Sequence, residues 1–230
     1  MPEAAELKEK VELRLGKLGP LRFLSHHDLL RVLERAFRRA RLPVRFTAGF
    51  HPRPRIVLPV PLEVGVESAD EPVEVEFSRW VPVPEVRTRL AGVLPPQLPL
   101  YAVRLLPPRR GSQPPVEVVY EARPGEAGAE VSEQMLAAFM MEESIPWQRR
   151  RPDGVVHLDL RKAVLSLELR GSTLVMRLRP GQGSARPYEV LEYLLGSRQA
   201  ALAVPVRRVK TTLAPLEVAG RKPPRRRHRR

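Results

Sequence analysis

The order of strand-like and helix-like segments is the feature that most limits the fold of this chain. Residues 11–107 show an extended pattern, a helical repeat, two further extended segments, a second helical repeat and a last extended segment. Residues 116–213 follow the same order without obvious sequence identity to the first set. A β-α-β-β-α-β order is the ferredoxin-like pattern. We therefore predict an α+β fold made of two tandem ferredoxin-like modules.

Composition marks the borders of these modules. The stretch PPRRGSQPP, residues 107–115, is rich in proline and arginine and has no apolar repeat, which is typical of a linker. The last ten residues, RKPPRRRHRR, hold seven Lys and Arg and no acid, which is typical of a disordered tail. We predict a first module at residues 8–107, a linker at 108–115, a second module at 116–217 and a basic disordered tail at 218–230.

The best-defined element is a helix that begins after Ser25 and ends at Pro43. Ser25 is a favourable N-cap, and Asp28 stands where a capping box is closed. Apolar residues recur on one side, at Leu29, Leu30, Val32, Leu33, Ala36, Phe37 and Ala40. Arginines gather on the other side, at Arg31, Arg35, Arg38 and Arg39. The pattern predicts an amphipathic helix with a basic outer face.

Shorter patterns of the same kind predict the remaining elements. Residues 71–77, EPVEVEF, alternate most regularly and predict a strand. We expect further strands at residues 98–107, 116–123, 155–170, 172–180 and 203–213, and helices at residues 84–94, 131–144 and 186–196. The segment GQGSARP, residues 181–187, lacks the glycine pattern of a dinucleotide site and the lysine of a P-loop, which favours a plain turn.

The residue inventory excludes several function classes. The chain has no cysteine, which removes disulfides, thiolate catalysis, and any zinc or iron–sulfur site held by its own thiolates. It has no apolar run of transmembrane length and no signal-peptide pattern at its start. We expect a cytoplasmic protein without a cofactor or metal of its own and without a membrane partner.

The charge balance indicates a polyanionic partner. The chain carries 40 Lys and Arg against 26 Asp and Glu, a formal charge of +14. Removing the seven charges of the last ten residues leaves +7 on residues 1–220, so the body is basic in its own right. Such an excess favours phosphate contacts with a nucleic acid. The preference for Arg over Lys alone also fits a GC-rich genome or a hot habitat.

Residues 22–68 resemble a known bacterial family. The segments FLSHHDLLRVLERAFRRARLP and GFHPRPRI carry the resemblance, with weaker matches in HLDLRKAV, RPYEVLEYL and VRRVKTTL. They resemble the radical SAM-linked proteins, a domain of unknown function found beside, or fused to, a radical S-adenosylmethionine protein. The resemblance implies a radical SAM protein as partner. The matching polar and turn positions are His26, Asp28, Arg31, Gly49, Pro52, Pro54 and Arg55.

Three positions depart from the family pattern. The pattern usually has Asn where this chain has His51, and often His where it has Arg53. The pattern usually has an aliphatic residue where this chain has His27. The resemblance therefore does not assign a catalytic role to any single side chain of this loop.

The loop TAGFHPRPR, residues 47–55, is the first candidate site. Gly49 lets the backbone turn or approach a ligand closely, while Pro52 and Pro54 stiffen the chain. The side chains that project from this ridge are His51, Arg53 and Arg55. If the first helix begins nearby, its free amides and His26 would complete an anion pocket suited to phosphate.

Two alternatives to this pocket stay open. In the first, the loop is a solvated connection whose arginines pair with Glu63 or Glu67. In the second, His26 and His51 are an acid/base pair for RNA cleavage, which requires one neutral and one charged imidazole beside a 2′-hydroxyl. A metal site is not expected, because His26 and His27 would point about 100° apart on a helix.

Charge and resemblance together favour a binding protein over an enzyme. The leading hypothesis is a noncatalytic RNA-binding or substrate-presenting partner of a radical SAM enzyme, with tRNA or rRNA as the RNA. The alternatives are a metal-independent, ribonuclease-like enzyme that uses His26 and His51, and a protein-only adaptor. The residues expected to contact phosphate or RNA are His26, Arg31, Arg35, Arg38, Gly49, His51, Arg53 and Arg55.

Overall fold

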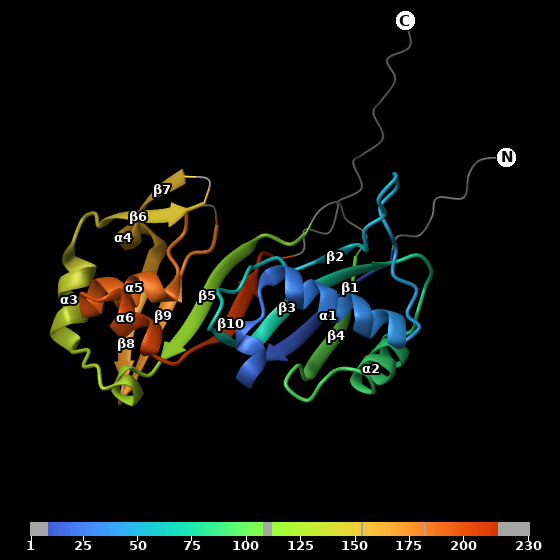
Figure 1. Ribbon diagram of the computed structural model, residues 1–230, viewed down its shortest axis with the longest axis horizontal. Coiled ribbons are helices and arrows are strands. Elements are labelled where there is room, and N and C mark those ends of the chain that lie inside the picture. Colours follow the sequence, from blue (N-terminus) through green and yellow to red (C-terminus); the bar gives the residue numbers. More distant parts are fainter. Residues whose placement is uncertain (1–8, 108–111, 153, 182, 216–230) are drawn as a thin grey trace, which may run out of the picture.

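The described part of the chain forms one long sheet with helices packed against it (Figure 1). The computed structural model describes residues 9–107, 112–152, 154–181 and 183–215. The sheet has the order β4-β1-β3-β10-β5-β9-β8, with β2 paired to β3 off this path, and β6 and β7 form a separate hairpin. The strands are β1 Glu9–Lys17, β2 Ile56–Val57, β3 Glu67–Phe77, β4 Leu100–Leu106, β5 Pro115–Ala122, β6 Pro146–Arg151, β7 Gly154–Asp159, β8 Val164–Arg170, β9 Thr173–Leu178 and β10 Val206–Leu213.

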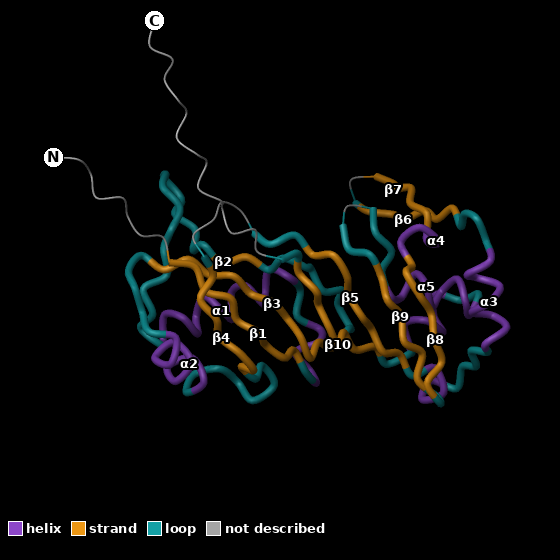
Figure 2. Tube along the Cα trace, turned by 180° about the vertical axis from the view of Figure 1, so that it is seen from behind, coloured by secondary structure: helices purple, strands orange, loops and turns teal. Residues whose placement is uncertain are grey.

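Most helices cover one face of this sheet, and the view from behind shows the strands in front of them (Figure 2). They are α1 His26–Arg39, α2 Val83–Ala91, α3 Glu133–Met141, α4 Leu160–Ala163, α5 Pro187–Leu195 and α6 Arg198–Ala203, with 3-10 turns at Gly19–Phe23 and Pro124–Ala127. The predicted α+β class is confirmed. None of the helices in the described ranges has the length and apolar character needed to cross a bilayer.

Each half of the sheet has the same internal strand order. The first half reads β4-β1-β3-β2 and the second reads β10-β5-β9-β8. If the strands of each half are numbered along the chain, leaving out β6 and β7, both halves have the spatial order fourth, first, third, second. This order is compatible with two tandem ferredoxin-like modules. The predicted linker residues 108–111 and the predicted tail, residues 218–230, lie outside the described ranges.

Helix α1 forms where the sequence predicts it because its cap and its apolar face agree. The Ser25 hydroxyl accepts a hydrogen bond from the Asp28 amide at 3.2 Å and donates one to the Asp28 carboxylate at 2.7 Å. Leu33 and Phe37 are buried against the sheet, and Phe37 meets Phe77 of β3 edge to face, with ring centroids 6.4 Å apart. Burying each such side chain stabilises the fold by about 1.5–3 kcal/mol. The apolar side of α1 therefore packs on the sheet, and its basic side faces solvent.

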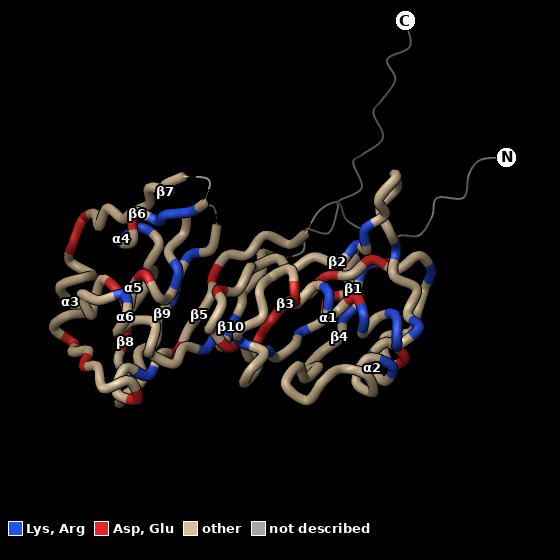
Figure 3. Tube along the Cα trace, viewed as in Figure 1, with Lys and Arg blue, Asp and Glu red and all other residues tan. Residues whose placement is uncertain are grey.

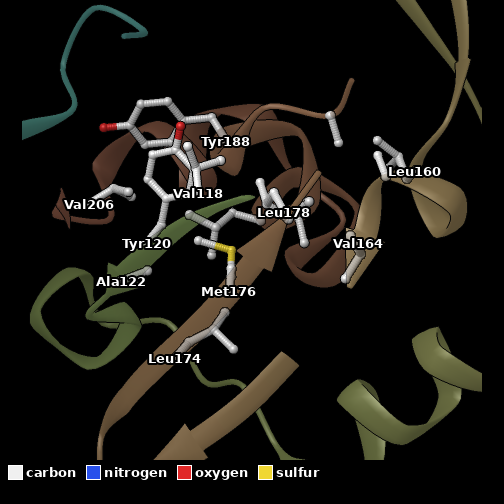
Figure 4. Close-up of a cluster of buried hydrophobic side chains, with 14 of the residues drawn as sticks. Val118, Tyr120, Ala122, Leu160, Val164, Leu174, Met176, Leu178, Tyr188 and Val206 are labelled. Carbon is white, nitrogen blue, oxygen red and sulfur yellow. The ribbon is translucent and has the colours of Figure 1, made fainter. Parts of the chain in front are cut away.

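A second hydrophobic core lies between the other half of the sheet and helices α5 and α6. Val118 and Tyr120 of β5 and Met176 of β9 pack in the same cluster as Tyr188 of α5 (Figure 4). The segment before β3 also enters this core, with Val60, Leu62 and Val66. The core of the second half is therefore completed by residues of the first half.

Strands β3 and β10 join the two halves into one sheet. They pair in parallel, with Arg207 opposite Glu67 and Arg208 opposite Ser68. Strand β2 has only two residues and pairs with the later part of β3. The early part of the same β3 edge is thereby left for β10.

Buried charges hold this junction together. Arg208 of β10 has no exposed surface, and its guanidinium donates a hydrogen bond to the carboxylate of Glu71 on β3. On the other face of the sheet, Arg14 donates to the Asp70 carboxylate at 2.9 Å and to the Thr211 carbonyl of β10 at 2.9 Å. Both faces of the sheet therefore carry a charged contact between β10 and the first half.

The region 155–170 is not the single strand that its alternation predicts. It contains β7, the helical turn α4 and then β8, and only β8 belongs to the main sheet. Asp159 makes the break, because its carboxylate accepts hydrogen bonds from the amides of Ile145 and Arg161, both at 3.0 Å. The bond from the Ile145 amide is the largest cause that lowers the pKa of Asp159 to about 2. Alternation continues through the turn, so periodicity alone does not reveal it.

Helix α6 is an element that the sequence pattern did not predict. Gly196, at φ 65°, ends α5 in the left-handed conformation. The Ser197 hydroxyl then accepts a hydrogen bond from the Ala200 amide at 3.3 Å and starts α6. Six residues are too few for a helical repeat to be recognised in the sequence.

Replacing Arg208 by methionine tests the charged junction. The substitution leaves the Glu71 carboxylate buried without its guanidinium partner, so we expect the free energy of unfolding to fall by about 3–5 kcal/mol. Urea denaturation followed by circular dichroism measures the change. The matched control is Arg170→Met, which removes the exposed partner of Glu168 at the far edge of the sheet. Equal midpoints for the two variants would contradict this role of Arg208.

Candidate anion-binding site

The loop singled out in the sequence forms a narrow projection between α1 and β2 (Figure 1). Its two arms bond to each other, since the Thr47 amide donates to the Arg53 carbonyl at 2.8 Å and the Arg53 amide to the Thr47 hydroxyl at 2.9 Å. Gly49 has a φ of 122°, which L-residues rarely adopt, and a Cβ there would meet no atom within 4 Å. The turn itself therefore requires Gly49. Phe50 and His51 at the tip are exposed.

His26 and this loop lie at opposite ends of α1. His26 is the first residue of the helix, whereas Phe46 and Pro54 of the loop line one small hollow with Arg38 of its last turns. A helix of 14 residues is about 20 Å long. The structure therefore does not bring His26 and His51 together, and the loop arginines do not share a pocket with the start of the helix.

The carboxylates expected to pair with the loop arginines have other partners. Arg55 lies 3.6 Å from Glu76. Glu67 pairs with Arg207 at 2.7 Å, and Glu63 faces the second half of the molecule. The predicted pairing of the loop with Glu63 or Glu67 is wrong for Arg55, because the turn carries the loop away from both acids.

The outer side of α1 carries an exposed stripe of arginines, which we call the α1 basic face. It consists of Arg31, Arg35, Arg38 and Arg39, and blue segments mark it along the helix in Figure 3. Asp28 lies 3.3 Å from Arg31, and Glu34 lies 3.4 Å from Arg38. Such exposed pairs contribute little energy, so these guanidinium groups exchange partners at low cost. The face is positioned as the helical repeat predicts.

A cavity of about 830 Å³ lies at the junction of the two halves. His26 reaches it from the start of α1, and residues 59–64 of the first half form one wall. The opposite wall comes from the beginning of β5, from β6 and from residues 183–187. The volume is within the range of sites that bind small organic ligands. We call it the junction cavity.

The junction cavity is basic. Its lining includes Arg149, Arg151, Arg186 and Arg198. Arg149 is buried and is held by the Glu189 carboxylate, with Nε and Nη2 each 2.6 Å from an oxygen. Glu63 is the acid of the lining, at 3.7 Å from Arg186 and 3.9 Å from Arg198. Burial raises the pKa of the Glu63 carboxyl, although the two arginines oppose the rise. The four arginines of the lining therefore have three carboxylates beside them, since Arg198 also bonds Glu192 at 3.2 Å.

Two polar atoms of the lining are buried without a hydrogen-bond partner among the described residues. They are Nδ1 of His26 and Oε2 of Glu63. Burial, followed by the charge of His27, lowers the pKa of His26, so the imidazole is mainly neutral at pH 7. Each of these two atoms exposes almost no surface, so both lie just behind the cavity wall, although other atoms of the same side chains line the cavity.

Sequence reasoning found His26 but missed the rest of this site. Residues 181–187 were expected to form a plain turn, yet residues 183–187 line the junction cavity. Arg149 and Arg151 lie on β6, whereas Arg198 lies on α6, and no motif joins the two elements. The described residues contain no group of three or more His, Asp or Glu side chains placed to hold a metal ion.

Fold and cavity together define an α+β protein whose two halves share one sheet and line a basic, open cavity at their junction. The chain belongs to a family of uncharacterised proteins conserved in bacteria, DUF2344, whose family model matches residues 10–190. The match covers α1, the loop at residues 47–55 and most of the cavity lining, and it ends before Arg198. A comparison with curated proteins finds no match.

Titration of His26 tests the environment of the junction cavity. We expect its midpoint in an NMR pH titration to lie below the ordinary value of about 6.5, because burial disfavours the charged ring. His27→Gln should raise the midpoint, since the charge on His27 is the second cause of the shift. The resonance is assigned by its loss in His26→Asn. A midpoint at or above that of a free histidine would show that His26 is not desolvated there.

Proposed function

We propose that this protein is a noncatalytic RNA-binding partner of a radical SAM enzyme, and that it holds the RNA on the α1 basic face. The observation that carries the proposal is the exposed arginine stripe Arg31, Arg35, Arg38 and Arg39 on a helix whose other side is firmly buried. Guanidinium groups bind phosphate oxygens through paired, charge-assisted hydrogen bonds. A rigid helix holds four of them at fixed spacing.

The projecting loop adds a stacking surface beside this face. Phe50 is fully exposed at its tip, and Phe46 is about half exposed at its base. Arg53 is exposed on the other arm of the loop, where it pairs with Thr47 through its backbone. Proteins that recognise unpaired RNA stack its bases on aromatic rings and arginine planes. We infer that the loop contacts bases while α1 contacts phosphates.

The radical SAM partner rests on the resemblance of residues 22–68 to radical SAM-linked proteins. This chain has no cysteine, so an iron–sulfur cluster ligated by cysteine must come from another protein. Binding and orienting the RNA is the task that its own arginines support. The ribonuclease alternative needs His26 and His51 at one site, and they lie at opposite ends of α1. If the protein does not bind RNA, the remaining alternative is a protein-only adaptor.

Charge reversal on the α1 basic face tests the proposal. The triple variant Arg31→Glu, Arg35→Glu and Arg38→Glu should weaken binding of a mixed-sequence, 30-nucleotide single-stranded RNA by at least about tenfold, measured by fluorescence anisotropy. The slope of log affinity against log salt should become shallower by about 2, because about 0.7 is lost for each phosphate contact.

The controls separate the folded body from the basic end. Arg123→Glu, Arg170→Glu and Arg177→Glu make the same change of charge on exposed arginines of the second half, and should weaken binding far less. Both triples are measured in the full chain and in a chain ended at Gly220. If the α1 triple binds as well as this control, RNA is not held on α1.

A further inference from the structure

We propose that the junction cavity binds one nucleotide unit, with the phosphate at its arginines and the base and sugar at its inner wall. This is a second site, separate from the α1 basic face. Its residues come from both halves of the molecule, whereas the α1 basic face belongs to one helix. The inference therefore does not require that α1 binds RNA.

The phosphate end of the site is formed by Arg186 and Arg198. Their side chains are about half exposed, and each points a guanidinium nitrogen toward Glu63 without reaching hydrogen-bond distance, at 3.7 and 3.9 Å. Arg198 also bonds Glu192 on α5 at 3.2 Å, which steadies it. Both cations lie beside one oxygen of Glu63, and because neither reaches hydrogen-bond distance from it, both keep donors available for a tetrahedral anion.

A buried frame holds this end of the cavity in place. One oxygen of Glu189 accepts the Arg186 amide at 2.8 Å, and both of its oxygens bind Arg149 at 2.6 Å. Arg149 in turn donates to the Ser184 carbonyl at 2.7 Å. Residues 183–187 are thus fixed to β6 before any ligand arrives. Such preorganisation lowers the entropy lost on binding.

The inner wall suits a group that is apolar on its faces and polar at its edges. Pro59, Val60, Leu62 and Val118 contribute apolar surface. The polar side chains of His26 and Glu63 also line this part of the cavity. A base packs its faces on apolar surface and hydrogen-bonds at its edge, and a ribose supplies hydroxyl groups.

Volume and chemistry together select a nucleotide over simpler ligands. Inorganic phosphate would engage the arginines but leave a cavity of about 830 Å³ mostly unfilled. A neutral apolar molecule would fill the wall and leave the cations unused. A nucleotide has a phosphate for the arginines, base faces for the apolar wall, and polar edges for the side chains of His26 and Glu63. The same unit is offered by a free mononucleotide and by the phosphorylated end of an RNA.

Calorimetric titration of the full chain with adenosine and uridine 5′-monophosphates tests the assignment, with inorganic phosphate and unphosphorylated adenosine as comparison ligands. We expect at least one mononucleotide to bind at least about tenfold more tightly than either comparison ligand. The double variant Arg186→Gln, Arg198→Gln should lose at least about tenfold of that affinity, since two charge-assisted bonds are removed. His26→Asn, which changes one wall atom, should weaken the mononucleotide but not inorganic phosphate.

The matched control is Arg170→Gln with Arg177→Gln, which removes the same charge from exposed positions of β8 and β9 and should bind mononucleotides normally. The α1 triple should also bind them normally, so failure of RNA binding on α1 is distinguished from failure of the cavity. Competition by a 5′-phosphorylated RNA, but not by its unphosphorylated form, would assign the unit to an RNA end. The proposal is overturned if mononucleotides bind no better than phosphate, or if both double variants lose equal affinity.

Discussion

The burial of Arg208 against Glu71 is the contact on which the rest of the arrangement depends. It lies where β10, the last strand of the described residues, meets β3 of the first half, and both side chains are buried. Removing one partner of a buried ion pair lowers the free energy of unfolding strongly, because the remaining charge stays desolvated. It therefore fixes the register of β10, and with it the alignment of two half-sheets into one. The contact of Arg14 with Asp70 and Thr211 repeats the constraint on the other face.

One consequence of this alignment is that residues of both halves line one cavity at the junction. The segment 59–64 leaves the first half, enters the second core with Val60 and Leu62, and on the way forms a wall of the junction cavity. His26 and Glu63 from the first half then face Arg186 and Arg198 from the second. Neither half alone contains the set. The α1 basic face, by contrast, needs only its own helix and the core beneath it.

Features that depend on neighbouring residues were predicted well from the sequence, whereas contacts between residues far apart in the sequence were not. The cap at Ser25 and the apolar stripe of α1 are read within a few turns of helix, so the exposure of Arg31 and Arg38 follows directly. Nothing near Arg208 in VRRVKTTL separates it from exposed Arg207, because burial depends on Glu71, far away in the sequence. Asp159 broke an apparently continuous strand through a bond to Ile145. The cavity arginines lie on three separate elements, and no spacing rule joins them.

The central claim is that folded residues, above all the α1 basic face, hold RNA. Ultraviolet crosslinking of the full chain in its native cells, followed by mass spectrometry of the crosslinked peptides, tests it most directly. The account predicts crosslinks on peptides from α1 and from residues 47–55, with a discrete RNA attached. Crosslinks confined to residues 221–230, or none on the body, would contradict it and leave the partner protein as the only candidate ligand for this surface.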